Sequence, residues 1–446
     1  MNAVMTASPE RARTDARPAR GGLLIVGGGF AGASLARMAG RAGATIVSPE
    51  NFMLYTPLLP DVAAGTVEPR HVVMPLRQMC PHADLILGAA AGLDEDARVL
   101  TVVTDTGTVD VAYDRLVLSP GAGSRSLPVP GLAERAVGFK TIEDAVHLRN
   151  TVLHRLDQAD AAPPDDRDRH LTFVFVGGGY AGVEAVAQLH ELVQHALRSY
   201  PRLAGARQRW ILADAAPRIL ASVPGRLGEY ATRQLTRRGI EIHTGARLLS
   251  AEGGRAVLSD GTDVATETLV WSAGVAPSGL GAALGLPVDE TGRIVVDRFL
   301  RVEGRERIHA LGDAARVPNA ATPAAIDPPT CQHALRQARR LARNIRRERR
   351  GRPPLPYAYR TRGQMALLGR HSAIAEVAGL HLRGFPAWLM ARTYHLNRLP
   401  LRRRRMRVAA DWAASAVFPW DITQLGSLGH PQPLGDPAGG SPNRTA

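Results

Sequence analysis

The chain has 446 residues, 45% hydrophobic and 22% charged, values that are typical of a globular protein of two or three domains. Its net charge of +14 predicts an anionic partner, either a membrane surface or a nucleic acid. Its two cysteines, Cys80 and Cys331, exclude a disulfide framework and a zinc site, and two free thiols favour a reducing, cytosolic setting.

The two ends of the chain carry little pattern. Residues 1–20 lack the apolar segment of a signal peptide, and we expect them to form a disordered tail. Residues 429–446 are rich in Gly and Pro, and we expect a second disordered tail there. No run between the tails reaches the roughly 18 apolar residues that a membrane-spanning helix needs.

The first ordered elements predict a nucleotide site. Leu23–Val26 is a continuous apolar run, typical of a strand buried on both faces of a parallel sheet. A Gly-x-Gly-x-x-Gly motif follows, formed by Gly27, Gly29 and Gly32, and it leads into a helix expected over 31–42. Such glycines allow a tight turn, a close approach to a pyrophosphate and close packing of helix on strand. The next strand is expected over 44–47.

The same plan recurs 150 residues later. A strand over 173–176 precedes Gly177, Gly179 and Gly182, and we expect a helix over 181–197 and a strand over 210–213. A strand followed by Ser-x-Gly also occurs twice, at 119–121 and 272–274, and residues 255–263 predict a hairpin. A single motif is weak evidence, but two copies in one context predict an α/β protein with two Rossmann-type dinucleotide-binding domains.

The residue after the second strand of each half indicates which nucleotide binds. In the second half this residue is Asp214, whose carboxylate would accept from a ribose hydroxyl and repel a 2′-phosphate, so NADH is favoured over NADPH. In the first half it is Ser48, and Glu50 follows two residues later. Glu50 either reaches the adenosine ribose of FAD or is a solvated loop acid.

The C-terminal third is strongly basic. Twenty arginines and two acids lie between Arg336 and Arg407. Apolar residues recur near helical spacing over 384–399, a run of four arginines follows, and three of the five tryptophans lie nearby. This pattern predicts an in-plane amphipathic membrane helix within 357–428. The alternatives are packing on the protein or at a dimer interface, and, with less support because no recognition motif is present, nucleic-acid binding.

Several stretches resemble type II NADH:quinone oxidoreductases, in particular the actinobacterial branch. This family of single-chain, non-proton-pumping flavoproteins belongs to the pyridine nucleotide-disulfide oxidoreductase superfamily. The similar stretches are NFMLYTPLLPDVAAGTVEPRHVVMPLR (51–77), FKTIEDAVHLRN (139–150), VFVGGGYAGVE (174–184), VWSAGVAPS (270–278), IHALGDAA (308–315) and PPTCQHALRQ (328–337).

The resemblance implies roles for residues at matching positions. Hydride would pass from NADH to FAD, and two electrons would pass on to a membrane quinone, with Glu184 and Gln332 as catalytic residues. The residues implied for FAD are Gly27, Gly29, Phe30, Ala31, Gly32, Glu50, Gly121, Asp313 and Gln332, with Asp313 on the ribityl hydroxyls. Those implied for NADH are Gly177, Gly179, Tyr180, Gly182, Glu184, Asp214 and Gly274.

The implied layout has an FAD domain in two parts, 21–140 and 281–352, an NADH domain over 141–280 and a membrane-association region over 357–428. The protein would be peripheral, on the cytoplasmic face of the cell membrane, and would hold no metal. Whether it forms a homodimer stays open at this point. The chain departs from the family pattern at Ser48, at Ser119-Pro120-Gly121, at Cys331 and at Arg336, where the family has Gln; here Gln337 stands beside it. The departures at Cys331 and Arg336 concern the acceptor site.

Other acceptors stay open at this point. Disulfide reductases of this fold use a cysteine pair beside the flavin, and this chain has no such pair, so direct transfer to an external acceptor is simpler. Glu184 or His333 could relay protons to a quinone. The alternatives are a soluble NADH-dependent reductase that uses oxygen, an iron–sulfur protein or another acceptor, and a flavin redox sensor that binds nucleic acid through its basic tail.

Overall fold

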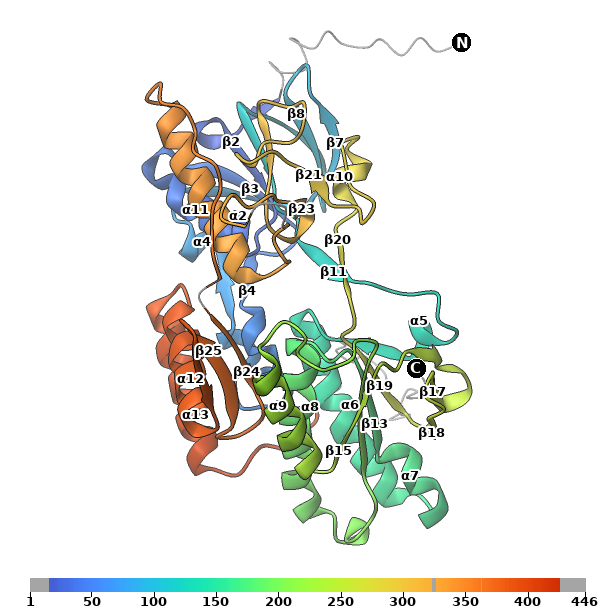
Figure 1. Ribbon diagram of the computed structural model, residues 1–446. Coiled ribbons are helices and arrows are strands. Elements are labelled where there is room, and N and C mark those ends of the chain that lie inside the picture. The colour runs from blue at the N-terminus through green and yellow to red at the C-terminus, as the bar shows by residue number, and fades with distance from the viewer. Residues whose placement is uncertain (1–15, 323–325, 362, 426–446) are drawn as a thin grey trace, which may run out of the picture.

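The computed structural model describes residues 16–322, 326–361 and 363–425, and its ribbon shows three units (Figure 1). The expected tail over 429–446 and residues 1–15 of the expected N-terminal tail lie outside the described residues. The end of the N-terminal tail differs from the prediction, because Arg17–Pro18 form strand β1, which pairs in parallel with β9 (Gly107–Ala112).

The first unit, at the top of Figure 1, is built on a five-stranded parallel sheet of order β22-β10-β2-β3-β6. These strands are β22 (Ile308–Ala310), β10 (Arg115–Leu118), β2 (Leu23–Val26), β3 (Ala44–Ser48) and β6 (Ala83–Leu87). Helices α2 (Phe30–Ala39) and α11 (Cys331–Glu348) pack against each other beside it. Smaller elements complete the unit: β7 (Ala89–Asp94) and β8 (Val99–Thr104) with β9 and β1, β4 (Phe52–Leu54) with β5 (Val73–Pro75), β21 (Ile294–Val295) with β23 (Ala315–Arg316), α3 (Leu59–Ala63), α4 (Leu76–Met79) and α10 (Leu280–Ala283).

The second unit repeats this plan with a five-stranded parallel sheet of order β12-β19-β13-β14-β15. These strands are β12 (Ala136–Gly138), β19 (Thr268–Trp271), β13 (Thr172–Val176), β14 (Arg209–Asp214) and β15 (Ile240–Thr244). The remaining elements are α5 (Leu132–Arg135), α6 (Ile142–Ala161), α7 (Arg167–His170), α8 (Tyr180–Ala196), α9 (Gly225–Arg237) and the antiparallel sheet of β16 (Leu248–Ser250), β17 (Arg255–Leu258) and β18 (Asp263–Ala265).

The apolar runs form the strands that the sequence predicts. All residues of β2 and β13 are buried, as expected for central parallel strands with helices on both faces. Trp210 of β14 stacks on Phe173 of β13 with 4.3 Å between ring centroids. The first helix is shorter than predicted: α2 ends at Ala39, because the next residue, Gly40, has φ +63°, a conformation that ends a helix.

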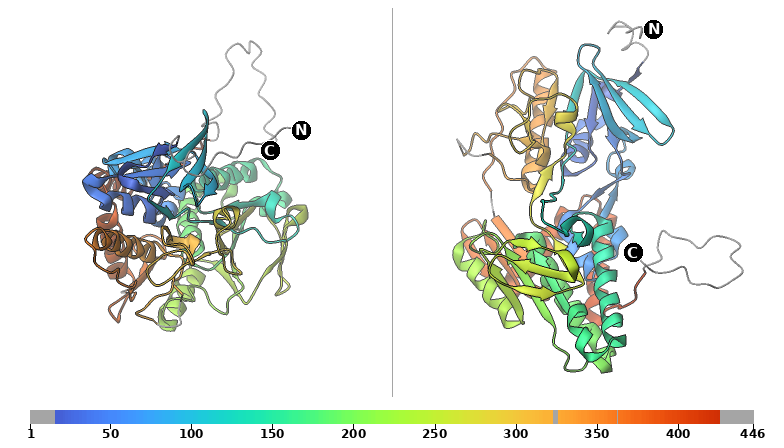
Figure 2. Two further views of the ribbon diagram at one scale, coloured as in Figure 1. Left: turned by 90° about the horizontal axis from the view of Figure 1, so that it is seen from above. Right: turned by 90° about the vertical axis from the view of Figure 1, so that its right-hand side faces the viewer.

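Two antiparallel strands connect the units. β11 (Ala122–Ser124) pairs with β20 (Val275–Pro277), and the turned view of Figure 2 (right) shows them between the two sheets. Each strand follows a glycine with positive φ, Gly121 at +77° and Gly274 at +74°, where the chain leaves the end of a central strand. The Ser-x-Gly repeat is therefore the point at which each half turns into the connection.

The third unit has a sheet that the sequence analysis did not predict. β24 (Gly363–Leu367), β25 (Ala373–Val377) and β26 (Leu380–Arg383) are antiparallel, and α12 (Phe385–Arg398) packs on them. α13 (Arg402–Val417) follows and contacts the turn over 69–71, where His71 Nδ1 and Asp411 Oδ2 form a hydrogen bond of 2.6 Å. Both helices lie at the lower left of Figure 1.

The expected amphipathic pattern of this unit needs correction. The sequence predicts an in-plane membrane helix with tryptophans nearby, but Arg392 of α12 is almost buried and its guanidinium lies over the Trp412 ring at 4.4 Å. Trp388 and Trp412 are half-buried. The exposed apolar side chains are instead Phe385 and Leu389 of α12, Met406 and Val417 of α13, and Phe418. Helical spacing alone could not show which face packs on the protein.

Candidate functional site

The first glycine turn lies between β2 and α2 and is shaped by close backbone contact. Gly27 has φ +105°, and a Cβ on Gly32 would lie 1.9 Å from the Gly27 carbonyl oxygen, so neither position accepts a side chain. A Cβ on Gly29 would meet no atom within 4 Å. Phe30 and Ala31 begin the helix, whose free N–H groups and dipole favour an anion at this open side.

The second turn has the same geometry between β13 and α8. Gly177 has φ +120°, a Cβ on Gly182 would lie 1.9 Å from the Gly177 oxygen, and a Cβ on Gly179 would again meet nothing within 4 Å. In both halves the serine that ends a neighbouring strand supports the turn: Ser119 Oγ donates to Val26 O at 3.0 Å, and Ser272 Oγ donates to Gly177 O at 3.1 Å.

The acids at the ends of the second strands differ between the halves. The Asp214 carboxylate accepts from the backbone N–H of Ala216 at 2.6 Å and from that of Gly178, so it is oriented beside the second turn. Ser48, at the matching place in the first half, is buried, and a Cβ on Gly28 would lie 2.8 Å from its hydroxyl oxygen. Glu50 is exposed.

Asp313 lies in the turn after β22, at the carboxyl edge of the first sheet. Among the described residues its carboxylate has no hydrogen-bond or ion-pair partner, and burial raises its pKa while Lys140 lowers it. Gln337 of α11 stabilises this turn, because its amide oxygen accepts from Gly312 N at 2.8 Å and its amide nitrogen donates to Asp327 at 3.0 Å. A half-buried, unpaired carboxylate on a fixed turn suits the hydroxyls of a ligand.

Lys140 is the only lysine of the chain, and the sequence analysis gave it no role. It follows β12 at the carboxyl edge of the second sheet, and the Asp144 carboxylate at the start of α6 accepts from its backbone N–H at 2.8 Å. Burial lowers the pKa of Lys140, and Asp313 opposes that shift. Lys140 and Asp313 therefore act on each other's charge across the facing edges of the two sheets, although no ion pair joins them among the described residues. The use of a single lysine among many arginines was the sequence signal for this position.

Glu184 lies on α8, one turn after Tyr180. Its carboxylate accepts from the backbone N–H of Leu367 in β24 at 2.8 Å, and Tyr180 donates to Gln364 of the same strand at 2.5 Å. Burial raises the pKa of Glu184 to about 8, with a smaller contribution of the same sign from Asp61, against the Leu367 hydrogen bond and Arg392. Glu184 therefore holds a proton at neutral pH.

Gln332 lies in the first turn of α11 and also contacts β24. Tyr359 donates to its amide oxygen at 3.1 Å, and its amide nitrogen donates to Gly363 O at 3.5 Å. Gln332 and Glu184 thus bind opposite ends of one strand, roughly 13 Å apart at about 3.3 Å per residue. The neighbouring His333 is buried and contacts Thr330 at 2.7 Å and Asp327 at 3.6 Å, which is a packed position.

The two thiols and the metal-ligating residues add no second redox centre to the described part of the chain. Burial raises the pKa of Cys80 and of Cys331 to about 11, so both are thiols at neutral pH rather than reactive thiolates. Within the described ranges, no three His, Cys, Asp or Glu side chains come together as a metal site would require.

Comparison with known proteins gives matches along most of the chain. A family model described as pyridine nucleotide-disulphide oxidoreductase matches residues 22–338. Two relatives from Mycobacterium tuberculosis are each 31% identical: the type II NADH:quinone oxidoreductase Ndh over 426 residues, covering 92% of this chain and 90% of the relative, and NdhA over 424 residues, covering 91% and 87%. The structure of NDH2 from Plasmodium falciparum in complex with NADH has the same fold, with a TM-score of 0.82 and 16% identity over 90% of this chain and 99% of that one.

The open space at Gly179 leads to a prediction. Gly179→Ala meets no protein atom, so the fold and its melting temperature stay unchanged, whereas the added methyl group occupies the place of an approaching pyrophosphate. We expect the dissociation constant for NADH to rise at least about tenfold, or roughly 1.4 kcal/mol, by calorimetric titration. Gly279→Ala is the control, since its Cβ is equally unhindered and lies outside both turns. Equal affinity in both variants would contradict a pyrophosphate site at this turn.

Proposed function

The chain belongs to the type II NADH:quinone oxidoreductases among the pyridine nucleotide-disulphide oxidoreductases, and we propose that it oxidises NADH through FAD and reduces a quinone. The observation that supports this most is the pair of glycine turns, one at the carboxyl edge of each sheet. The reactive rings of two dinucleotides bound there would meet between the facing edges of the two sheets, where Lys140 and Asp313 lie. The activity needs no proton pumping and no cysteine pair.

The residues present fit FAD in the first unit. The turn at Gly27, Gly29 and Gly32 offers an uncovered helix start for a pyrophosphate, and Asp313 offers a carboxylate without a protein partner for ribityl hydroxyls. When bound, FAD would supply the two-electron chemistry between NADH and the quinone. In the second unit Asp214 would accept from the ribose of NADH, and its charge would oppose the 2′-phosphate of NADPH.

We assign Glu184 and Gln332 to the proton and acceptor side of the reaction. Quinone reduction consumes one solvent proton for each NADH, and Glu184 holds a proton at neutral pH against β24. Gln332 has an amide oriented by Tyr359 and Gly363 at the start of α11 and would orient the acceptor. Cys331 beside it is a small protonated thiol, so this departure from the family pattern leaves an apolar neighbour of similar size.

The activity is tested on the purified full-length protein. We expect NADH to bleach the flavin absorbance under anaerobic conditions, and a short-chain ubiquinone analogue to restore it faster than oxygen does. NADPH should bleach it more slowly because of the Asp214 carboxylate. Protein that takes up no FAD, or flavin that NADH leaves oxidised, contradicts the proposal. Bleaching that only oxygen reverses would favour a soluble reductase with another acceptor.

Glu184 predicts a pH dependence of quinone reduction. Because its pKa is raised to about 8, the side chain is neutral below that pH and loses its proton as the pH rises through it. We expect kcat with quinone to fall through pH 8, and we expect this limb to be absent in Glu184→Gln. The free energy of unfolding should also fall as the pH rises. Between the pKa of Glu184 in the unfolded chain and about 8, the folded state retains a proton that the unfolded state has released, so stability decreases. The control Glu229→Gln, at an exposed position of α9, should keep the pH dependence of both kcat and stability. If kcat of Glu184→Gln still falls through pH 8, Glu184 does not have the proposed role.

We propose that the third unit binds an anionic membrane at the cytoplasmic face of the cell. Exposed apolar side chains of α12, α13 and Phe418 lie beside clustered arginines, an arrangement that suits insertion into a lipid interface. Arg339 of α11 and Arg398 of α12 each repel the other's charge, and Arg404 of α13 lies near Arg70, so the basic surface runs over three helices. Over the described ranges, no helix has the length and apolarity to cross a bilayer.

Membrane binding is tested by flotation with vesicles. A variant with Leu389→Ser, Val417→Ser and Phe418→Ser should lose flotation with phosphatidylglycerol vesicles, because each change removes exposed apolar surface. The control changes Val103→Ser and Leu249→Ser, which are similarly exposed on other units, and should float like the unchanged protein. Equal flotation of both variants contradicts the proposal. A dimer that this variant dissociates without an effect on vesicles would assign the surface to a second copy of the chain.

A further inference from the structure

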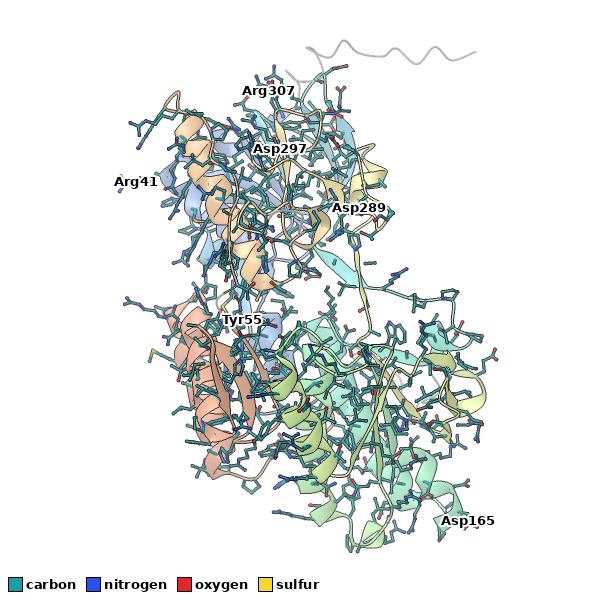
Figure 3. The ribbon with its side chains drawn as sticks, in the orientation of Figure 1. Arg41, Tyr55, Asp165, Asp289, Asp297 and Arg307 are labelled. Atoms are coloured by element: carbon teal, nitrogen blue, oxygen red, sulfur yellow. The ribbon has the colours of Figure 1, made fainter. Side chains whose placement is uncertain are left out.

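A buried tyrosine–histidine pair lies outside the residues that the function has used so far. Tyr55 follows β4, and its hydroxyl lies 3.2 Å from Nδ1 of His395 on α12. The rings meet edge to face, with 6.1 Å between centroids. Tyr55 is buried and His395 is half-buried. The pair joins residues 340 positions apart, across the junction of the first and third units, where Figure 3 labels Tyr55.

The pair lies between the first glycine turn and an open groove. On the inner side, the Tyr55 ring is 5.6 Å from the ring of Phe30, the first residue of α2, and the Cys331 thiol at the start of α11 is near enough to affect its titration. On the outer side, Tyr394 precedes His395 and lines a groove of about 700 Å³ on α12 together with Leu389 and Arg398. Ring contacts therefore run without a break from Phe30 at the first glycine turn, through Tyr55 and His395, to Tyr394 in the groove.

Charged groups surround the pair on its remaining sides. From α3, Asp61 is fully buried and forms an ion pair with Arg392 of α12, and Trp412 donates to the same carboxylate oxygen at 3.3 Å. The other oxygen, Oδ2, is buried and has no hydrogen-bond partner among the residues that the structure describes. Asp61 and Arg392 act on both His395 and Glu184, so the pair and the proton-holding acid face one buried ion pair.

The directions of the pKa shifts of Tyr55 and His395 indicate that both side chains are neutral at physiological pH. Burial raises the pKa of Tyr55 well above its usual value, with the same sign from Cys331 and Tyr394 and the opposite sign from Arg398. Burial lowers the pKa of His395 to about 4, with Asp61 opposing this shift and Arg392 adding to it. At neutral pH the tyrosine keeps its proton and the imidazole carries no charge, so a proton can cross the pair without leaving a charge inside the protein.

We infer that Tyr55 delivers the proton to the quinone and that His395 resupplies Tyr55, an inference that rests on the proposed function. The quinone oxygen that has gained an electron pair forms an O–H bond with the Tyr55 proton. The Tyr55 O–H bond breaks, and its oxygen takes the proton from His395 Nδ1. His395 binds a solvent proton at Nε2, so the reaction consumes one solvent proton and the protein keeps its charge. The hydride of NADH, passed on through the flavin, supplies both electrons and the other hydrogen of the quinol. Tyr55 is thus the residue at the reacting atom, and His395 positions and refills it.

Tyr55 is better suited to this step than its neighbours. Cys331 is a thiol with a pKa of about 11, but among the described residues no side chain forms a hydrogen bond with its sulfur. Tyr394 lies in the groove next to His395, whereas the hydrogen bond of His395 is made to Tyr55. Glu184 is bound to β24 through Leu367, so it serves as a store of protons rather than as the group at the groove.

The experiment separates proton-coupled from pure electron transfer. Tyr55→Phe and His395→Gln are reduced with NADH and then reoxidised either by a short-chain ubiquinone analogue or by ferricyanide, which takes electrons without protons. We expect reoxidation by the quinone to slow on the order of 100-fold in Tyr55→Phe, and less in His395→Gln, while reoxidation by ferricyanide is unchanged. The solvent isotope effect on the quinone step should increase, and the quinone dissociation constant and the melting temperature should stay the same.

Tyr200→Phe and His243→Gln are the matched controls, because each removes one hydrogen-bonded side-chain group far from the groove, from Asp157 and Asp260 respectively. Both should behave like the unchanged protein. Quinone reoxidation within about threefold of the unchanged protein in Tyr55→Phe would overturn the inference. Equal slowing with ferricyanide would also overturn it, because the pair would then only hold α12 against β4. Failure of NADH to reduce the flavin in the unchanged protein would instead refute the proposed function.

Discussion

The architecture depends on one steric constraint that occurs twice. The third glycine of each motif must let its helix approach the carbonyl of the first glycine so closely that a Cβ would lie 1.9 Å from that oxygen. This contact fixes the start of α2 over β2 and the start of α8 over β13, with free N–H groups at the carboxyl edge of each sheet. Since both edges are built in this way, the connection through β11 and β20 decides whether the two sites can serve one reaction.

The third unit contacts both nucleotide-binding units. β24 contacts α8 through Glu184 and Tyr180 and contacts α11 through Gln332, so one strand touches both nucleotide-binding units. The buried Asp61 and Arg392 pair holds α12 against α3. A buried ion pair is weak evidence for stability, because desolvation of both charges offsets much of their attraction, but removal of one partner would leave an uncompensated charge. The pair therefore favours one position of α12 over others.

The local sequence pattern was sufficient to predict those parts of the site that the backbone forms. Apolar runs bounded by glycines predicted β2, β3, β13 and β14 within one residue at each end, because buried parallel strands carry a continuous signal. The contacts of Glu184 with Leu367 and of Tyr55 with His395 span 183 and 340 residues, and no periodicity encodes such pairs. The sheet β24–β26 was missed because its short strands carry few apolar residues in alternation. The burial of Arg392 was not predicted for a related reason: helical spacing defines an apolar stripe but not which partner covers it.

A two-electron flavin enzyme that uses no cysteine pair must bring its acceptor to the flavin itself, and this requirement accounts for the position of the third unit. Its outward surface is apolar and basic, its groove lies on α12, and the residues directly behind the groove are neutral at physiological pH despite the buried charges near them. An apolar quinone that left a lipid phase would meet only neutral side chains behind this groove. A proton would be needed only when the quinone is reduced. Under these proposals the exposed apolar side chains of α12 would face the lipid while His395 on the same helix carries the proton, so one helix would serve both requirements.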